Sequence, residues 1–499
     1  MAGDIVSTPY SRVFLIESGA NPNTSPSYEG LWKAGAATFG QGDVTPIRIP
    51  SADRYGQFKT VGSIAGTPDL PELAITARYS FDLSDMLRLV NIGCNHDLQV
   101  HMGQCQNPSD FNGGWDKILV LEQARISNYS TSDLGAIEPG DNAVVNEDVT
   151  WQGQLIYEIG KLTATEVGST TITREVIAVA ICDQAGCGGS CGTASDGCQN
   201  VFMVTLAGGG SAGLSADVVW SSNGFSTSTT IHITTLGLTE SPDDAACVGD
   251  NLVVVSGGAG ASDSLHYADI AAILAGTQTW TEVNTGFVVS KGPQAIWSIG
   301  PNETWMAGAG GYIYFTDDPT AGVTVQDAGV ATSQDLNDIH MLDSTHGVAV
   351  GASNAVIRTT DGSTWGAVTG PAVGVALNAV WMKSEDIWLV GTAGGALYYT
   401  ANGGTSWTAL GFSGSGAGAV DDIYFVNQTV GYLSHHTAAP VGRIFRTIDG
   451  GNSWYLLPEN GSMPDNDRIN SIKACSVNTV FGGGLGGGGT DGFAAKLTA

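Results

Sequence analysis

Basic residues are scarce in this chain. Only 19 Lys and Arg stand against 48 Asp and Glu among 499 residues, which gives a formal net charge of −29. No run of basic residues occurs, so binding to nucleic acid by neutralising its phosphates is disfavoured. Such acidity usually serves solubility. The alternative is an acidic wall that repels DNA, which would suit a conduit through which DNA slides.

Long apolar stretches are missing as well. No segment approaches the roughly 18 apolar residues that a membrane-spanning helix requires. The first ten residues lack both a basic region and an apolar core, so we expect no Sec signal peptide. These absences predict a protein that is made in a cytoplasm and is not inserted into a membrane.

Cysteine is infrequent, with eight residues, and four of them lie in one Gly/Ser-rich segment: Cys182, Cys187, Cys191 and Cys198. Their spacing departs from the paired pattern of zinc sites. Two local disulfides, or a clasp at a domain boundary, are the alternatives. Cys94 and Cys105 could pair across a turn, and we expect Cys247 and Cys475 to be buried free thiols. We therefore expect no metal and no cofactor.

What the chain has in abundance is glycine, 70 residues, and a repeated turn sequence. The clearest copies are Thr359-Thr-Asp361-Gly-Ser-Thr-Trp365, Thr400-Ala-Asn402-Gly-Gly-Thr-Ser-Trp407 and Thr447-Ile-Asp449-Gly-Gly-Asn-Ser-Trp454. In each copy Asp or Asn can cap its own turn, Gly allows a positive φ, and Trp can pack into the next strand. A period of this length indicates a repeat architecture.

Weaker copies extend the register in both directions. The seven Asp or Asn anchors that we assign are Asn223, Asp269, Asp318, Asp361, Asn402, Asp449 and Asp491. Short apolar strands recur between them, which together make four strands per repeat, as in a propeller blade. The sequence thus predicts an all-β protein whose residues 200–499 form a seven-bladed β-propeller. We expect the strand at 201–206 to close the ring against the chain's end, and the Gly-rich run at 482–489 to form inner turns.

The repeated turn resembles the Asp-box of sialidases, sortilins and photosystem-assembly propellers. That resemblance implies a turn between the two outer strands of each blade, with a structural role. A sialidase-like site would also need three Arg, a Tyr–Glu pair and an Asp, and too few Arg are present. No pair of carboxylates stands out for glycoside hydrolysis either. We therefore expect no catalysis, and we expect Trp297, Trp305, Trp381 and Trp388 to pack between blades rather than to bind sugar.

Residues 1–199 lack the repeat and are expected to form a separate β-rich domain. A short helix is predicted at Leu83-Ser-Asp-Met-Leu-Arg-Leu-Val90, with Ser84 or Asp82 as its cap. The long segments 18–45 and 102–115 are expected to be irregular, and loops of that length commonly bind a partner.

One part of this half, Tyr129-Ser-Thr-Ser-Asp-Leu-Gly-Ala136 followed by a strand ending in Tyr157-Glu-Ile159, resembles the major tail tube protein of long-tailed bacteriophages. The resemblance covers about residues 70–160 and implies a tube-building β-sandwich. It implies closed rings, which we expect to be hexameric, stacked around phage DNA that passes without specific binding.

This interpretation makes the protein a virion component of the tail, with the propeller outside, where it could contact host-surface glycans. The carboxylates predicted to face the lumen or the seam between rings are Asp133, Glu138, Asp141, Glu147 and Asp148. The alternatives are a non-catalytic propeller that serves as a binding or assembly module and, less favoured, a sialidase-like glycosidase.

Overall fold

The computed structural model of the chain divides into two compact units. One unit contains nearly all residues up to Gly160, and the other runs from Lys161 to Ala499. The structure describes residues 5–6, 12–17, 28–30, 34–42, 48–50, 58–60, 69–78, 96–102, 117–131, 146–153, 155–182, 200–206, 216–237, 240–257, 263–412, 417–438, 441–458, 462–487 and 491–499. Before residue 150, side chains are described at 97–101 and 117–124 only.

The N-terminal unit is built on antiparallel strands. Its main sheet has the order β1-β4-β7-β10-β9-β8-β2-β3, with β11 also paired to β9, and β5 and β6 form a separate pair. The strands are β1 (Ile5–Val6), β2 (Arg12–Glu17), β3 (Tyr28–Gly30), β4 (Ala34–Gly42), β5 (Arg48–Pro50), β6 (Phe58–Thr60), β7 (Asp69–Arg78), β8 (His96–Met102), β9 (Lys117–Thr131), β10 (Asn146–Gln152) and β11 (Leu155–Gly160).

Strand β9 organises this sheet because it has different partners along its length. Its first part pairs with β8 and β11, and its second part pairs with β10. Leu98, Val100, Ile118 and Val120 are fully or almost fully buried, so β8 and β9 contribute to the core of this unit.

The second unit contains seven four-stranded antiparallel sheets in the described part of the chain. From the axis outward, blades 1 to 3 are β13 (Val176–Ile181), β14 (Val201–Leu206), β15 (Ala216–Ser221), β16 (Thr229–His232); β17 (Pro242–Val248), β18 (Asn251–Ser256), β19 (Ser264–Asp269), β20 (Thr281–Val283); and β21 (Pro293–Gly300), β22 (Glu303–Gly308), β23 (Tyr312–Thr316), β24 (Thr324–Ala328).

Blades 4 to 7 follow the same plan. They are β25 (Leu336–Met341), β26 (Gly347–Gly351), β27 (Val356–Thr359), β28 (Trp365–Val368); β29 (Leu377–Met382), β30 (Trp388–Thr392), β31 (Leu397–Thr400), β32 (Thr408–Leu410); β33 (Gly418–Phe425), β34 (Gly431–Thr437), β35 (Gly442–Thr447), β36 (Tyr455–Leu457); and β37 (Asn466–Ser476), β38 (Thr479–Gly486), β39 (Gly492–Thr498), β12 (Thr163–Glu166).

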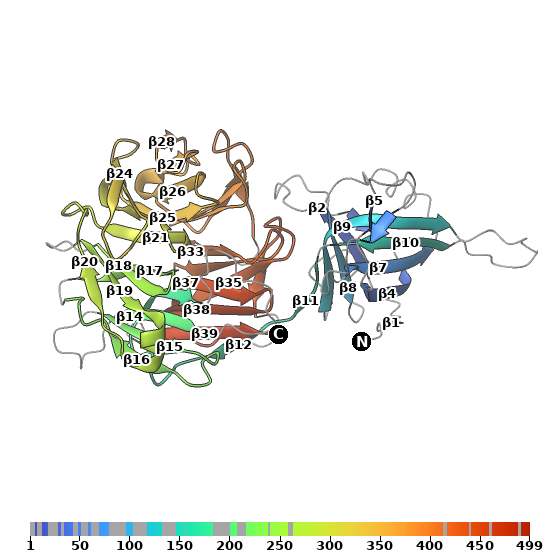
Figure 1. The fold of residues 1–499 in the computed structure, drawn as a ribbon, viewed down its shortest axis with the longest axis horizontal. Helices are drawn as coiled ribbons and strands as arrows, with labels where there is room; N and C mark the ends of the chain where they lie inside the picture. The colour runs from blue at the N-terminus through green and yellow to red at the C-terminus, as the bar shows by residue number, and fades with distance from the viewer. Residues whose placement is uncertain are drawn as a thin grey trace, which may run out of the picture. The chain divides into compact units, whose positions relative to one another are not determined.

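The seven innermost strands close a ring, because each contacts the innermost strand of the next blade and β37 returns to β13. The ring is fastened by β12, which lies beside β39 and supplies the outer strand of blade 7 (Figure 1). The core lies between blades. For example, Trp305 of blade 3 packs in one buried cluster with Ile339, Met341 and Trp365 of blade 4. The predicted all-β class and four-stranded blades are confirmed.

The structure moves the predicted domain boundary from 199/200 to Gly160/Lys161. Two strands that precede residue 200 belong to the propeller, β12 in blade 7 and β13 in blade 1. The strand at 201–206 therefore does not close the ring; it is the second strand of blade 1. The first copy of the repeated turn follows the third strand of that blade. A domain boundary inferred from the repeat therefore lies too far along the chain.

Other expectations also change. Segment 18–45 contains the whole of β3 and β4, so it is not wholly irregular. Gly482 to Gly486 lie within strand β38 rather than in a turn. The helix expected at Leu83 and the segment from residue 103 to 115 lie outside the described residues.

Helical structure in the described part of the chain is slight. It comprises α2 (Ile270–Ala275) and the 3-10 turns η1 (Ala309–Gly311) and η2 (Ala352–Asn354). No helix among the described residues is long and apolar enough to cross a membrane.

Candidate functional site

The repeated turn is held by its own Asp or Asn. In blade 4, Asp361 Oδ1 accepts hydrogen bonds from the backbone N–H groups of Ser363 at 2.8 Å and Thr364 at 2.6 Å. These donors hold the pKa of Asp361 well below its ordinary range. Trp365 is 7% exposed, and its indole N–H donates to Gln326 of blade 3 at 3.1 Å. The turn therefore holds the connection between the third and outer strands of blade 4 and also contacts blade 3.

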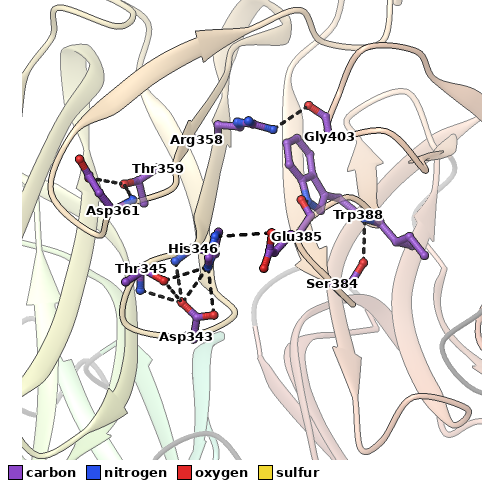
Figure 2. Close-up of polar contacts among 11 residues, drawn as sticks. Asp343, Thr345, His346, Arg358, Thr359, Asp361, Ser384, Glu385, Trp388 and Gly403 are labelled. Carbon is purple, nitrogen blue, oxygen red and sulfur yellow. Dashed lines mark hydrogen bonds and ion pairs between the residues drawn. The ribbon is translucent and has the colours of Figure 1, made fainter.

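The glycine that follows the anchor links three parts of the propeller. In blade 4, Gly362 N–H donates to Thr345 O, in the hairpin between the two inner strands, and Gly362 O accepts from the indole of Trp305 in blade 3. Blade 5 repeats this arrangement with other donors: Arg358 of blade 4 donates to Gly403 O at 3.4 Å (Figure 2). Lys383 of blade 5 likewise donates to Gly450 O of blade 6 at 2.7 Å.

The same interface carries a second contact between blades 4 and 5. Asp343 Oδ1 accepts from the backbone N–H groups of Thr345 and His346, and His346 Nε2 lies 3.7 Å from Glu385 Oε2 (Figure 2). We call the face of the propeller that carries the repeated turns the box side. The polar residues described here on that side are engaged in contacts within and between blades.

Five of the seven predicted anchors lie between the third and outer strands of their blades, and a sixth, Asp269, is the last residue of the third strand β19. Asn223, Asp318, Asn402 and Asp449 accept backbone N–H bonds in turns. Asp269 differs, because it caps α2 by accepting from Ala272 N at 2.7 Å. Trp407 and Trp454 donate to the backbone oxygens of Thr369 and Gly451.

The assignment of Asp491 to this series is wrong. Asp491 precedes the third strand of blade 7, so it lies in the connection from the second strand, on the opposite face. The equivalent turn cannot exist in blade 7, because its outer strand β12 comes from the other end of the unit.

We expect Gly362→Ala to destabilise the propeller by about 1–3 kcal/mol, the usual cost of a strained backbone position. Gly362 has φ +74°, and an added Cβ would collide with the carbonyl oxygen of Ser344. Gly366→Ala is the matched control, because a Cβ there meets nothing within 4 Å. Denaturant unfolding of both variants measures the difference, and equal stabilities would contradict the proposed role of the turn.

A second repeated feature lies at the axis. Each innermost strand has a β-bulge at the equivalent position, where one residue is left out of the pairing with the second strand. From blade 1 to blade 7 the bulged residues are Ile177, Asp243, Gln294, Asn337, Asn378, Asp421 and Asn470. Bulges redirect side chains and bend a strand; here they place six polar side chains around the axis.

The first residue after each bulge alternates between Asp and a small residue. From blade 1 to blade 7 the series is Ala178, Asp244, Ala295, Asp338, Ala379, Asp422 and Ser471. Each innermost strand has a partner strand on one edge only, so the backbone amides of its other edge need acceptors.

Three aspartates and one serine supply those acceptors for all seven blades. In each of the three blades that have Asp at this position, the Oδ1 atom of that Asp accepts the backbone N–H of the next residue. The Oδ2 atom accepts the N–H at the equivalent position in the following blade. Asp338, for example, accepts from Ile339 and Val380 at 2.8 and 2.7 Å. Asp244 and Asp422 do the same. Because seven is an odd number, Asp and a small residue cannot alternate all the way round the ring. At the one break in the alternation, Ser471 Oγ accepts the remaining N–H, that of Val179, at 3.2 Å.

These aspartates and Ser471 line a cavity of about 220 Å³. All seven innermost strands contribute to its lining, including the bulged residues, the three aspartates and, deeper along the strands, Trp297, Tyr424 and Lys473. The sequence pattern did not reveal it, because the lining residues are separated by a whole blade. The recurrent Asn-Asp or Asp-Asp pair at the start of inner strands was the available signal.

The cavity is strongly acidic. Burial, and then the neighbouring Asp422 carboxylate, raise the pKa of Asp338 well above its ordinary value. Burial raises the pKa of Asp244 to about 6 and that of Asp243 to about 7. Lys473 is the counter-ion: burial opposes its charge, but the aspartates raise its pKa overall.

These shifts predict that the cavity aspartates contribute less to the stability of the propeller as pH rises from about 4 to about 8, whereas the buried His266 and His340, whose pKa values burial lowers to about 4 and about 3, act in the opposite direction. A carboxyl with a raised pKa binds its proton more tightly in the folded state, so the unfolding free energy falls as pH passes through that range. We expect a loss of about 1–3 kcal/mol, less than the full shifts imply, because the side chains face the cavity. Thermal unfolding of residues 161–499 across this range measures it. The difference between the parent and Asp243→Asn isolates the contribution of this carboxyl group: the parent should lose stability relative to the variant as pH rises, and an unchanged difference would contradict the assignment.

The four predicted tryptophans divide into two pairs. Trp305 and Trp388 are buried at 2% and 1% exposure, as expected for packing between blades. Trp297 and Trp381 instead lie on innermost strands near the axis, where both pack against His340, with ring centroids 4.2 Å apart in each case. Tyr424 continues this arc beside Trp381.

The cysteine prediction needs correction. Cys182 forms a disulfide with Cys247, 65 residues away, which joins the innermost strands of blades 1 and 2. Cys475, on the innermost strand of blade 7, is also disulfide-bonded, so neither Cys247 nor Cys475 is a free thiol. Sequence spacing favoured local pairs, whereas the ring brings distant strands together. Cys94, Cys105, Cys187, Cys191 and Cys198 lie outside the described residues.

We expect Cys182→Ser with Cys247→Ser to lower the unfolding free energy by about 4 kcal/mol, the loop-closure value for 65 residues. The double variant should unfold at the same temperature as the parent protein in which the Cys182–Cys247 disulfide has been reduced. A double variant as stable as the oxidised parent would show that this disulfide does not stabilise the propeller.

The predicted lumen carboxylates remain predictions. Asp133, Glu138 and Asp141 lie outside the described residues, and Glu147 and Asp148 are on β10, which is described by its backbone. No group of three or more His, Cys, Asp or Glu that could hold a metal occurs in the described part of the chain.

Comparison with known proteins places the propeller near one family. The model of the photosystem II assembly factor YCF48 matches residues 323–479. Among solved structures, YCF48 bound to a D1 peptide is 14% identical, covering 68% of this chain and 97% of that chain with a TM-score of 0.48. YCF48 from Cyanidioschyzon merolae is also 14% identical, covering 68% and 99%, with a TM-score of 0.49.

An enzyme is also among the similar structures. Virginiamycin B lyase from Staphylococcus aureus is 12% identical and covers 68% of this chain and 100% of that chain, with a TM-score of 0.48. At such identities and scores, these likenesses carry no functional argument. No curated protein matches the chain. The family match lies wholly within the propeller, so the tail tube interpretation of the N-terminal unit stays a prediction.

Proposed function

We propose that the chain is a non-catalytic binding or assembly protein whose propeller holds its ligand at the axial cavity. The observation that carries this proposal is the hydrogen bonding of Asp244, Asp338 and Asp422: both oxygens of each accept backbone N–H bonds. A carboxylate held this way stabilises the ring and is poorly placed to transfer protons or attack a sugar.

The other charged groups beside the cavity support the same conclusion. Asp421 accepts from both Nε and Nη2 of Arg468, at 3.1 and 2.7 Å, and pairs with His436. Arg358 binds a box carbonyl on the opposite face. Both of these arginines are therefore held by oxygen atoms of the protein itself, which disfavours their use in gripping a substrate carboxylate as a sialidase-like glycosidase requires.

The ligand of a rigid propeller face can be a peptide, as in the solved structure of YCF48 with its D1 peptide, or a host-surface glycan. We expect labelled residues 161–499 to bind saturably to members of a peptide array or a glycan array without turnover. Chromogenic glycosides, sialosides included, should stay intact. Hydrolysis that disappears in Asp244→Asn, or no binding on either array, would overturn the proposal.

A second candidate concerns the N-terminal unit, which we propose polymerises into a phage tail tube around DNA, in a virion. It is favoured by the place of Tyr129-Ser-Thr-Ser-Asp-Leu-Gly-Ala136, which starts near the end of β9 and leads into the connection to its antiparallel partner β10. Electron microscopy of residues 1–160 should show hollow tubes of stacked rings, expected to be hexameric. A monomer at every concentration would reject this candidate and leave the binding module intact.

A further inference from the structure

Five exposed valines lie on one face of the propeller among its described residues. Val288, Val289, Val330 and Val375 lie in connections from the outer strand of one blade to the inner strand of the next, and Val441 lies between β34 and β35. In a four-stranded meander, these two kinds of connection emerge on the same face. Val330 is 88% exposed and Val289 is 68% exposed, so both side chains are open to contact with a partner.

The cavity lies at this same end of the innermost strands. The bulged residue is the second residue of the strand in five blades, for example Asp243 in β17 and Asn337 in β25. The contacts of the box turns lie at the other end of the blades. The valines therefore lie on the face of the propeller at which the polar residues of the cavity begin.

Lys473 shows which chemistry the cavity accepts. Its Nζ lies 3.4 Å from Asp422 Oδ2 and 5.4 Å from the centroid of the Tyr424 ring. A carboxylate combined with an aromatic face is the usual environment of a bound cation. The cavity thus already holds one ammonium group in this way.

More carboxyl groups line the cavity than Lys473 engages. Asp243, Asp244 and Asp338 also line the cavity, and within the described residues none of them forms an ion pair with Lys, Arg or His. Trp297 offers a second aromatic side chain in the lining. A ligand that brings one further cation would favour the ionised form of these carboxyl groups, whose pKa values burial raises, and would contact the aromatic side.

We propose that this face docks a protein loop presenting a Lys or Arg side chain between apolar residues, with the cationic head in the cavity and the apolar neighbours on the valines. This inference rests on the proposed binding function and specifies its ligand. The side-chain oxygens of Asp243 and Asn378 are suitable acceptors for an ammonium or guanidinium group. The exposed valines favour a protein over a glycan, because a sugar offers little apolar surface to cover them.

The test uses the full chain against a displayed library of random peptides and, separately, a glycan array. We expect the enriched peptides to carry Lys or Arg flanked by apolar residues, and their affinity to fall with added salt. Enrichment of neutral or acidic peptides, or binding only to glycans, would overturn this inference but leave the binding function standing. No binding to either would overturn both.

Variants then locate the site. Asp243→Asn removes a charge but can still accept the N–H of Gly257, which Asp243 Oδ2 accepts at 2.6 Å. It should weaken an enriched Lys peptide on the order of tenfold, and Val330→Ser should weaken it severalfold. The controls are Asp343→Asn, on the box side, and Leu456→Ser, on the outer strand β36. Equal effects of test and control variants would overturn the placement.

Discussion

A fragment of residues 161–499 is expected to fold as a stable propeller, whereas residues 200–499 should not. The shorter fragment lacks β12, the outer strand of blade 7, and β13, the innermost strand of blade 1. Val176, Val179 and Ala180 of β13 are almost fully buried, and β13 contacts both β17 and β37. Its removal would open the ring at the axis and expose the edge of β14, and the loss of β12 would expose the edge of β39, to pairing with other chains.

Soluble yield, circular dichroism and thermal unfolding of the two fragments measure this effect. We expect a cooperative transition for 161–499 and aggregation or a non-cooperative melt for 200–499. A third fragment, 170–499, keeps β13 and lacks β12, so it separates the loss of the fastening strand from the loss of the inner strand. If 200–499 unfolds with the same midpoint as 161–499, ring closure through β12 and β13 is wrong.

Asp338→Ala should be among the most destabilising single substitutions at the axis, with an expected cost of about 2–6 kcal/mol. It leaves two buried donors, the N–H groups of Ile339 and Val380, without their acceptors, and each unsatisfied group costs about 1–3 kcal/mol. Loss of the carboxylate also relieves repulsion with Asp422, which reduces the net cost. We expect the unpaired donors to outweigh that relief, because the carboxylates face the cavity, where solvent screens their repulsion.

Ser471→Ala provides the matched comparison. It removes the acceptor of one N–H group, that of Val179, and removes no charge. Denaturant unfolding at neutral pH should therefore show a cost about half that of Asp338→Ala, in the range of about 1–3 kcal/mol. A cost for Asp338→Ala no larger than that for Ser471→Ala would mean that the aspartates do not each serve two blades.

The sequence alone determined the repeated elements of this protein. Spacing of Asp361, Asn402 and Asp449 indicated blades, because each repeat must bury one face against its neighbours and so keeps a constant length. The turn chemistry was equally visible, since Asp or Asn, Gly and Trp act within a few residues of one another. The resemblance of the first half to a tail tube protein also came from a local run of residues, and it stays a prediction.

Tertiary structure alone decided what happens where the ring closes and at its axis. β12 fastens blade 7 and Asp491 falls outside the box series because circular closure joins the two ends of the unit, and Cys182 pairs with Cys247 because the innermost strands of blades 1 and 2 lie side by side. The sharing of Asp338 between two blades, and the broken alternation at Ser471, depend on seven strands meeting around one axis. Such contacts follow from the number of blades and their order in space, which no window of neighbouring residues contains.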